Sequence, residues 1–141
     1  MHTLKRTLEI DAPPNEVWRV LTTPDLIREW ACAYLDGLHI RTSFREGAAV
    51  TWKARDGATR ACGTVAACQP ERLLKFQYEN GDRGVCSDTF EISAVDHKSR
   101  LKITTGPLEK PDFDALKGPS AQAIKEIKSL AEESARIHRV R

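Results

Sequence analysis

Long apolar segments are absent from this sequence, and no stretch approaches the roughly 18 residues that a membrane-spanning helix needs. An excess of one charge is absent as well, because 22 Lys and Arg residues stand against 20 Asp and Glu residues. This balance argues against a protein dedicated to nucleic acid or to a membrane surface. The first residues, MHTLKRTLEIDAPP, carry cations but no apolar segment behind them. No secretory signal is therefore predicted, and the expected location is cytoplasmic.

Spacings typical of metal sites are also absent. The cysteines Cys32, Cys62, Cys68 and Cys86 form no CxxC pair and have no histidine cluster beside them, which argues against a zinc site. Without a secretory signal, we expect a reducing compartment and four free thiols on small, buried side chains. No cofactor is predicted either, because residues 81–84 lack the lysine and the following helix of a phosphate-binding loop.

The composition that remains is that of an ordinary globular protein, with 40% hydrophobic and 30% charged residues in a chain of 141. A chain of this length buries about two-thirds of the surface that its unfolded form exposes. We therefore expect one domain, residues 1–141, that folds without disulfides or a structural metal.

The chain begins with the pattern of one strand followed by two short helices. Leu4, Leu8 and Ile10 alternate with polar neighbours, which is typical of a half-buried strand. Pro14 and Pro24 then mark two helix starts, because proline is well tolerated in the first helical turn.

Apolar and polar residues alternate again over residues 38–105, with tight turns between the runs. Asp56-Gly57 is a hairpin signal, and residues 80–84, with two glycines, are predicted to form a loop. Short strands joined in sequence order by such turns predict an antiparallel meander.

A long helix is predicted at the end of the chain, from Gly118-Pro119-Ser120 to about Ile137. Residues 107–119 are expected to form a loop with at most one helical turn around residues 112–117. The inward stripe of the long helix is mostly apolar and contains Ala123, Ile124, Ile127, Leu130, Ala131 and Ser134.

Together these elements predict an α+β fold built on a single sheet. A curved antiparallel sheet of about seven strands wraps around the long C-terminal helix, and two short helices follow the first strand. Several members of the inward stripe are small, so the sequence predicts either close packing or a cavity between helix and sheet.

Several segments in order along the chain carry a resemblance to a known family. They are Ala12–Trp18, Leu21–Pro24, Trp30, Thr42–Gly47, Trp52, Asp56-Gly57, Gly63–Val65 and Pro70–Leu73. The chain resembles bacterial proteins similar to the C-terminal domain of the Hsp90 ATPase activator, within the START/Bet v 1-like superfamily. The resemblance runs from about residue 3 to residue 105, and the final helix fits by position.

This resemblance implies a helix-grip fold with a hydrophobic cavity between the sheet and the last helix. The resemblance implies no particular activity. The function that we expect is noncatalytic binding of an apolar or aromatic small molecule by a monomer or homodimer. Two alternatives remain open: an interaction module associated with Hsp90-type chaperones, and an enzyme of cyclase or hydrolase type that uses Asp88. Fold alone does not decide among them.

The candidate ligand-binding residues are the aromatic side chains expected near the cavity, one carboxylate and two residues of the last helix. They are Trp30, Tyr34, Trp52, Phe76, Tyr78, Asp88, Phe90, Ile124 and Ile127. Ligand sites are mostly apolar with a few polar anchors, which is the mixture that this set provides.

Asp88 is the most informative polar residue of the set. It shares strand parity with Phe90 and Ile92, which predicts that its side chain faces inward. An inward carboxylate orients a ligand or transfers a proton if its pKa is raised. Alternatively, it escapes to water at a strand end or meets an arginine, and the sequence leaves both possibilities open.

No catalytic residue is predicted from the histidines. His39 has no acidic or nucleophilic neighbour in the sequence, and His2, His97 and His138 fall at chain ends or turns. A catalytic histidine needs such a neighbour within hydrogen-bond reach. We expect all four to be solvated.

Overall fold

The structure is a computed structural model that describes residues 1–79 and 85–139. Its strands are β1 (His2–Ile10), β2 (His39–Arg41), β3 (Ala49–Lys53), β4 (Thr59–Gln69), β5 (Leu73–Glu79), β6 (Val85–Val95) and β7 (Lys98–Leu108). Its helices are α1 (Pro14–Thr22), α2 (Pro24–Ala31) and α3 (Lys110–Arg139). The loop predicted at residues 80–84 lies outside the described residues.

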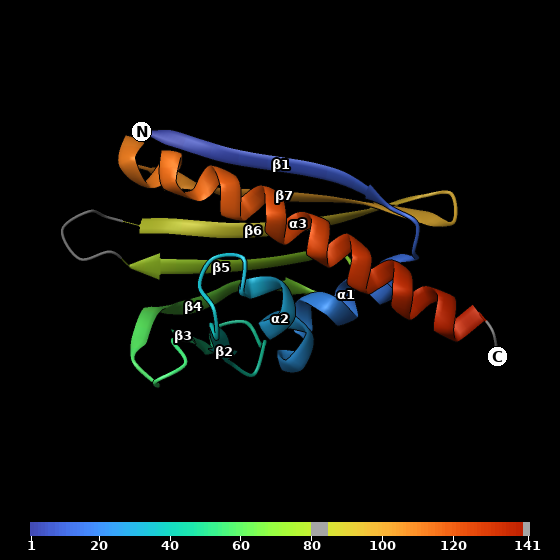
Figure 1. The fold of residues 1–141 in the computed structure, drawn as a ribbon, viewed down its shortest axis with the longest axis horizontal. Coiled ribbons are helices and arrows are strands. Elements are labelled where there is room, and N and C mark those ends of the chain that lie inside the picture. Colours follow the sequence, from blue (N-terminus) through green and yellow to red (C-terminus); the bar gives the residue numbers. More distant parts are fainter. Residues whose placement is uncertain (80–84, 140–141) are drawn as a thin grey trace.

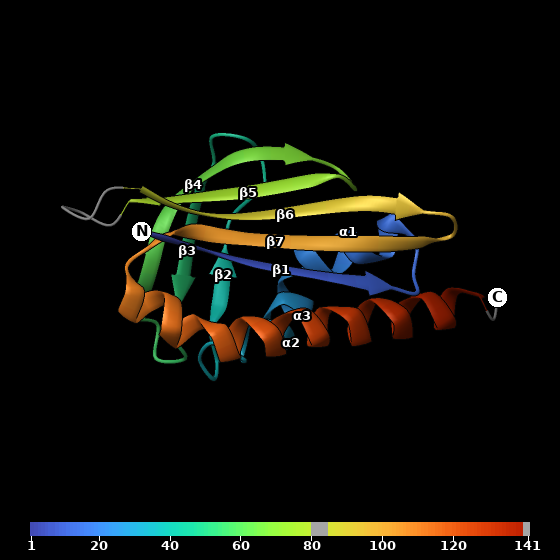
Figure 2. The ribbon, with the colours of Figure 1, turned by 90° about the horizontal axis from the view of Figure 1, so that it is seen from above.

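The strands form one antiparallel sheet of seven strands in the order β1-β7-β6-β5-β4-β3-β2. Every neighbouring pair from β2 to β7 is consecutive in the chain, as the meander predicts, and β1 joins the far edge beside β7. Figure 2 shows that β2 and β3 run at a steep angle to β6 and β7, so the sheet curls. The α+β helix-grip architecture expected from the sequence is confirmed.

The two short helices begin where the prolines predict. Pro14 and Pro24 occupy the first turns of α1 and α2, where a missing N–H breaks no helical hydrogen bond. The Asp56-Gly57 turn is also present: the Ala54 N–H donates to the carbonyl of Ala58, and Gly57 has a φ of 89°. The prolines and the Asp-Gly pair act through local backbone geometry, so their effect can be predicted from the sequence.

The long helix differs from the prediction at its beginning. Helix α3 starts at Lys110, before Gly118, and Pro119 lies inside it. Pro119 has no N–H to donate to the carbonyl of Ala115, so the sequence suggests a boundary there. The segment 107–119 is therefore helical over most of its length, where a loop was expected.

Tertiary packing explains why the first turns of α3 are helical. Phe113 and Leu116 pack against Leu4, Cys86 and Leu108, which form a small apolar cluster beside the main core. Burial of a helix face is the main source of helix stability in proteins. Packing in this apolar cluster holds residues 110–117 against the sheet as a helix, although Pro119 lacks the N–H of a regular helical residue.

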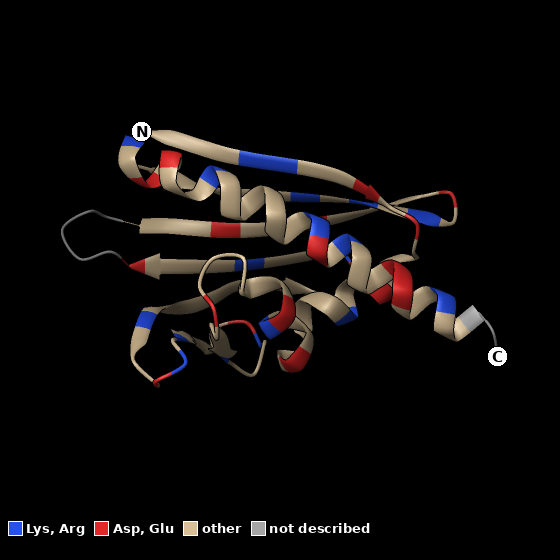
Figure 3. Cartoon of the chain, viewed as in Figure 1, with Lys and Arg blue, Asp and Glu red and all other residues tan. Residues whose placement is uncertain are grey.

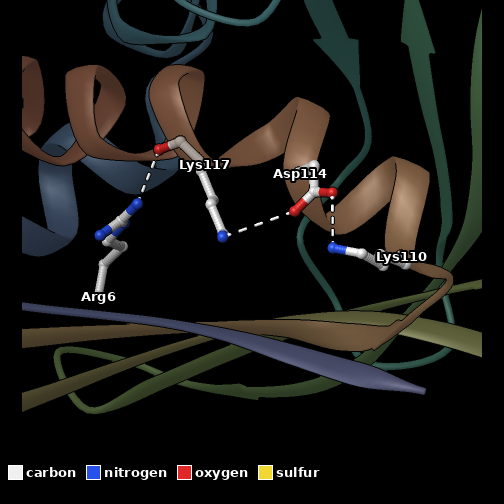
Figure 4. Close-up of polar contacts among 4 residues, drawn as sticks. All are labelled: Arg6, Lys110, Asp114 and Lys117. Atoms are coloured by element: carbon white, nitrogen blue, oxygen red, sulfur yellow. Dashed lines mark hydrogen bonds and ion pairs between the residues drawn. The ribbon is translucent and has the colours of Figure 1, made fainter.

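A hydrogen bond joins the same part of α3 to β1, and two ion pairs lie within the helix (Figure 4). The guanidinium of Arg6 donates to the carbonyl oxygen of Lys117 over 2.8 Å. Asp114 forms ion pairs with Lys110 at 3.1 Å and Lys117 at 3.5 Å. The arginine thereby satisfies a carbonyl oxygen one residue before the Gly118-Pro119 pair.

The main core lies between the concave face of the sheet and the three helices. Figure 1 shows α3 crossing that face diagonally, with α1 and α2 beside it. The largest fully buried side chains are Phe76, Ile10, Leu21, Ile27, Leu74, Leu101 and Ile127. Ile124, Ile127 and Ala131 of the predicted inward stripe are buried, whereas Leu130 is only half-buried.

Charged residues of both signs are interspersed over the helices, strands and loops in the view of Figure 3. Mixed charge of this kind agrees with the formal net charge of +2. In the described part of the chain, no helix combines the length and the apolar character that crossing a membrane requires.

Candidate functional site

A cavity of about 360 Å³ lies at the end of the core covered by the first half of α3. Its walls come from β1, α2, the segment after α2, strands β3 to β7 and α3. The volume falls within the range of small-molecule pockets, which is about 300–1,000 Å³. The lining side chains are Leu4, Trp30, Tyr34, Leu35, Leu38, Trp52, Arg60, Ala61, Tyr78, Cys86, Asp88, Phe90, Ile103, Thr105, Leu108, Leu116 and Ser120.

The structure brings six of the nine candidate residues to this cavity. They are Trp30, Tyr34, Trp52, Tyr78, Asp88 and Phe90. The other three, Phe76, Ile124 and Ile127, are buried in the core and do not line it. Phe76 supports the wall from behind, since its ring lies 6.4 Å from that of Trp52 and 6.0 Å from that of Phe90.

Asp88 faces inward, as its strand parity predicts, and lines the cavity. The Thr105 hydroxyl donates to Asp88 Oδ1 over 2.6 Å, and the Tyr78 hydroxyl is a second donor to the carboxylate. Thr105 is the direct partner of Asp88 in the β6–β7 register. The partners of Asp88 are therefore neutral hydroxyls, where the sequence left an arginine or solvent as alternatives.

A second layer of hydrogen bonding fixes the Tyr78 ring. The indole Nε1 of Trp52 donates to the Tyr78 hydroxyl over 2.8 Å. A hydroxyl that accepts from Trp52 keeps its own proton for Asp88. Trp52, Tyr78, Asp88 and Thr105 thus form one connected chain, which we call the carboxylate network.

Burial raises the pKa of Asp88, and the hydrogen bonds from Thr105 and Tyr78 offset only part of that rise. Burial and the nearby Asp88 charge also raise the pKa of Tyr78 well above its ordinary value. The same two causes raise the pKa of Tyr34 to about 12, although a hydrogen bond with Ser120 opposes them. Both phenols are therefore neutral at physiological pH and act in the cavity as hydroxyl groups.

These shifts predict how Asp88 affects stability. A raised pKa in the folded state means that ionisation destabilises the fold, so stability falls as pH rises from the unfolded value of 3.8 through the folded value. Asp88→Asn removes this cost and should raise the melting temperature at pH 7.5. The gain should shrink toward zero at pH 4.

Thermal melts at the two pH values check this expectation, with Glu91→Gln as a matched control. Glu91 lies on the same strand but is exposed, so its amide variant should melt like the wild type at both pH values. A lower melting temperature for Asp88→Asn at pH 7.5 would contradict the assignment of a destabilising charge.

The four thiols are free, as the spacing predicts. The expectation that all are buried is wrong: Cys32 and Cys62 are exposed, Cys68 is half-buried, and only Cys86 is buried. Cys86 lines the cavity, and burial raises the pKa of its thiol. Within residues 1–79 and 85–139, no group of three or more His, Cys, Asp or Glu side chains has an arrangement that would hold a metal ion.

Sequence reasoning missed a buried polar cluster at the other end of α3. Glu16 is buried, accepts from the Ser134 hydroxyl over 2.5 Å, and lies 2.5 Å from His138 Nδ1. The guanidinium of Arg19 donates to Ser134 over 2.6 Å. Burial alone would raise the pKa of Glu16, but the contacts with Ser134, His138 and Arg19 outweigh it and lower this pKa.

His138 is exposed, as expected, but Glu16 gives it an acidic partner that the sequence did not indicate. Glu16 and His138 are 122 positions apart, so no local pattern reports their contact. The cluster lies outside the cavity lining and ties α1 to the last turns of α3. We therefore assign it to the structure of the fold.

The architecture defines a class of protein in which a curved antiparallel sheet grips a long C-terminal helix and leaves a cavity beside it. The model of the family "Activator of Hsp90 ATPase homolog 1-like protein" matches residues 11–132. The chain belongs to this family. A comparison with curated proteins found no match.

Solved structures share the fold. Protein MLL2253 from Mesorhizobium loti has a TM-score of 0.78 at 19% identity, covering 94% of this chain and 98% of that one. The Aha1 dimer from Colwellia psychrerythraea has a TM-score of 0.74 at 19% identity, covering 94% and 97%. CalU16 from Micromonospora echinospora has a TM-score of 0.70 at 16% identity, covering 96% and 84%. At these identities the likeness shows the fold alone.

Proposed function

We propose that this protein is a cytoplasmic, noncatalytic binding protein for an apolar or aromatic small molecule. The single observation that carries the proposal is the cavity of about 360 Å³, lined mainly by apolar and aromatic side chains with a few polar groups, Asp88, Thr105, Ser120 and Arg60 among them. A few polar groups among apolar walls are what orient a small ligand.

Aromatic contacts around the cavity also support this function. Trp30 stands edge-to-face with Trp52 at 6.3 Å and with Phe90 at 6.0 Å, so these rings brace one another. A preformed wall reduces the loss of side-chain entropy on binding, because the side chains are already ordered. The cavity therefore suits an apolar or aromatic ligand.

The test uses the neutral fluorescent probe N-phenyl-1-naphthylamine and a variant that fills the cavity. Ala61 lines the cavity opposite Trp52 in the β3–β4 register, so Ala61→Trp should obstruct it. We expect saturable binding to the wild type with one probe per chain, weakened at least about tenfold in Ala61→Trp.

Ala66→Trp is the matched control, because Ala66 lies on the same strand, is exposed and does not line the cavity. It should bind the probe like the wild type. Native mass spectrometry of freshly purified wild type should in addition detect a resident ligand that Ala61→Trp lacks. Probe binding that Ala61→Trp leaves unchanged would contradict the proposed site.

The second candidate function is a module that associates with an Hsp90-type chaperone, favoured by the family description and by the likeness to the Colwellia Aha1 dimer. A chaperone pull-down with wild type and Ala61→Trp separates the two functions. Capture of the chaperone by both forms, without a cavity ligand in the wild type, would favour the second candidate over the first.

A further inference from the structure

The carboxylate of Asp88 has more capacity to accept hydrogen bonds than the protein fills. An ionised carboxylate offers about four lone-pair positions, and Thr105 and Tyr78 supply two donors. Both donors are neutral. Among residues 1–79 and 85–139, no Lys, Arg or His forms an ion pair with Asp88.

Several other polar groups that line the cavity are already engaged. Trp52 donates to Tyr78, Tyr78 donates to Asp88, and the Tyr34 hydroxyl bonds with Ser120. Arg60, the one lining cation in the described part of the chain, is exposed and forms no ion pair with the carboxylate. A molecule that fills the cavity must therefore bring its own donor to Asp88, or leave the carboxylate under-satisfied at a free-energy cost.

The walls around the carboxylate favour a donor that is positively charged. Trp30 of α2, Trp52 of β3 and Phe90 of β6 line the same cavity as Asp88. Aromatic rings attract a cation through their negative faces, and a charged donor forms a stronger bond to a carboxylate than a neutral one. Aromatic rings and an uncompensated carboxylate together suit an organic ammonium group.

We infer that the cavity selects lipophilic amines, whose ammonium group donates to Asp88 while the apolar body contacts the aromatic wall. The inference rests on the proposed small-molecule function and adds the chemical class of the ligand to it. Amine binding neutralises the charge of Asp88 inside the cavity, so complex formation also removes the destabilisation that this charge causes in the empty protein.

Three probes of nearly equal shape test the inference by isothermal titration calorimetry at pH 7.5: 2-naphthylmethylamine, 2-naphthylmethanol and 2-naphthoate. They present a cationic donor, a neutral donor and an anion to the same site. We expect the amine to bind at least about tenfold more tightly than the alcohol, and the naphthoate to bind most weakly.

Two variants show whether Asp88 causes the preference. Asp88→Asn should bind the amine and the alcohol with affinities within about twofold of each other. Glu91→Gln, which removes an exposed carboxylate from the same strand, should keep the wild-type preference. Because Asp88→Asn is expected to be at least as stable as the wild type at this pH, loss of the preference will not reflect unfolding.

Equal binding of all three probes, or tighter binding of the naphthoate, would overturn the amine assignment and leave the proposed cavity function intact. A preference that persists in Asp88→Asn would likewise overturn it, because the cation would then be recognised elsewhere. If none of the three probes binds while N-phenyl-1-naphthylamine does, the amine assignment fails alone. If neither set binds, the proposed function fails as well.

Discussion

Ile127→Ala is expected to lower the free energy of unfolding by about 2–5 kcal/mol. Ile127 is fully buried at 0% exposure, in the part of α3 that packs against β1, α1 and α2. It does not border the cavity, so the truncation opens a new void in the packed core. The loss is a large part of the roughly 5–15 kcal/mol that stabilises a typical domain. Urea unfolding monitored by circular dichroism measures it.

Ile137→Ala is the matched control in the same helix. Ile137 is 56% exposed, so removal of the same methyl groups should change the free energy of unfolding by no more than about 0.5 kcal/mol. If Ile127→Ala unfolded at the same urea concentration as the wild type, the placement of α3 on the sheet would be wrong.

Gly63→Ala is expected to destabilise the protein by about 3 kcal/mol, at the upper end of the usual cost of overpacking. A Cβ at position 63 would lie 2.0 Å from the carbonyl oxygen of Gln77 and 2.9 Å from the Cα of Tyr78. Gly63 is the direct partner of Tyr78 in the β4–β5 register. The two strands must separate to admit the methyl group, because both close contacts are to backbone atoms.

This strand separation should also disturb the carboxylate network, since Tyr78 holds hydrogen bonds to Trp52 and Asp88. Near-ultraviolet circular dichroism and tryptophan fluorescence of the folded variant will report that change.

Gly47→Ala is the matched control, because it adds a methyl group at a strained backbone position without a steric clash. Gly47 has a φ of 85°, and no heavy atom of the described residues beyond its chain neighbours lies within 4 Å of an added Cβ. It should cost about 1 kcal/mol and leave the tryptophan spectra unchanged. Equal effects of the two substitutions on the spectra would argue against the close strand contact.

Most of the fold could be predicted because its signals are local. The alternation of Leu4, Leu8 and Ile10, the prolines at the starts of α1 and α2, and the Asp56-Gly57 turn each act over a few residues. The start of α3 could not be predicted in this way. Pro119 signals a boundary locally, and the packing of Phe113 and Leu116 on a distant strand overrides that signal.

In the candidate site, too, the direction of a side chain could be predicted from neighbouring residues, but its contacts with other strands could not. The period of two along β6 predicted that Asp88 points inward, next to Phe90. The donors to Asp88 could not be identified, because Thr105 and Tyr78 meet it only through the registers of β6 with β7 and β5. Phe76 and Ile127 were assigned to the ligand site because side-chain direction alone does not separate a packed core from the wall of a cavity beside it.

The position of β1 has a consequence for the order in which the chain acquires its structure. Within the described residues β1 pairs with β7 alone, so His2 lies opposite Leu108 and Ile10 opposite Ser99. On a ribosome, residues 2–10 leave the exit tunnel before the other strands, but their hydrogen-bonding partner β7 is made only about a hundred residues later. Contacts so distant in sequence slow folding, because a large loop must close before they form. The hairpins from β2 to β7 can assemble while the edge of β7 is still unpaired, and closure by β1 then completes the surface on which α3 docks.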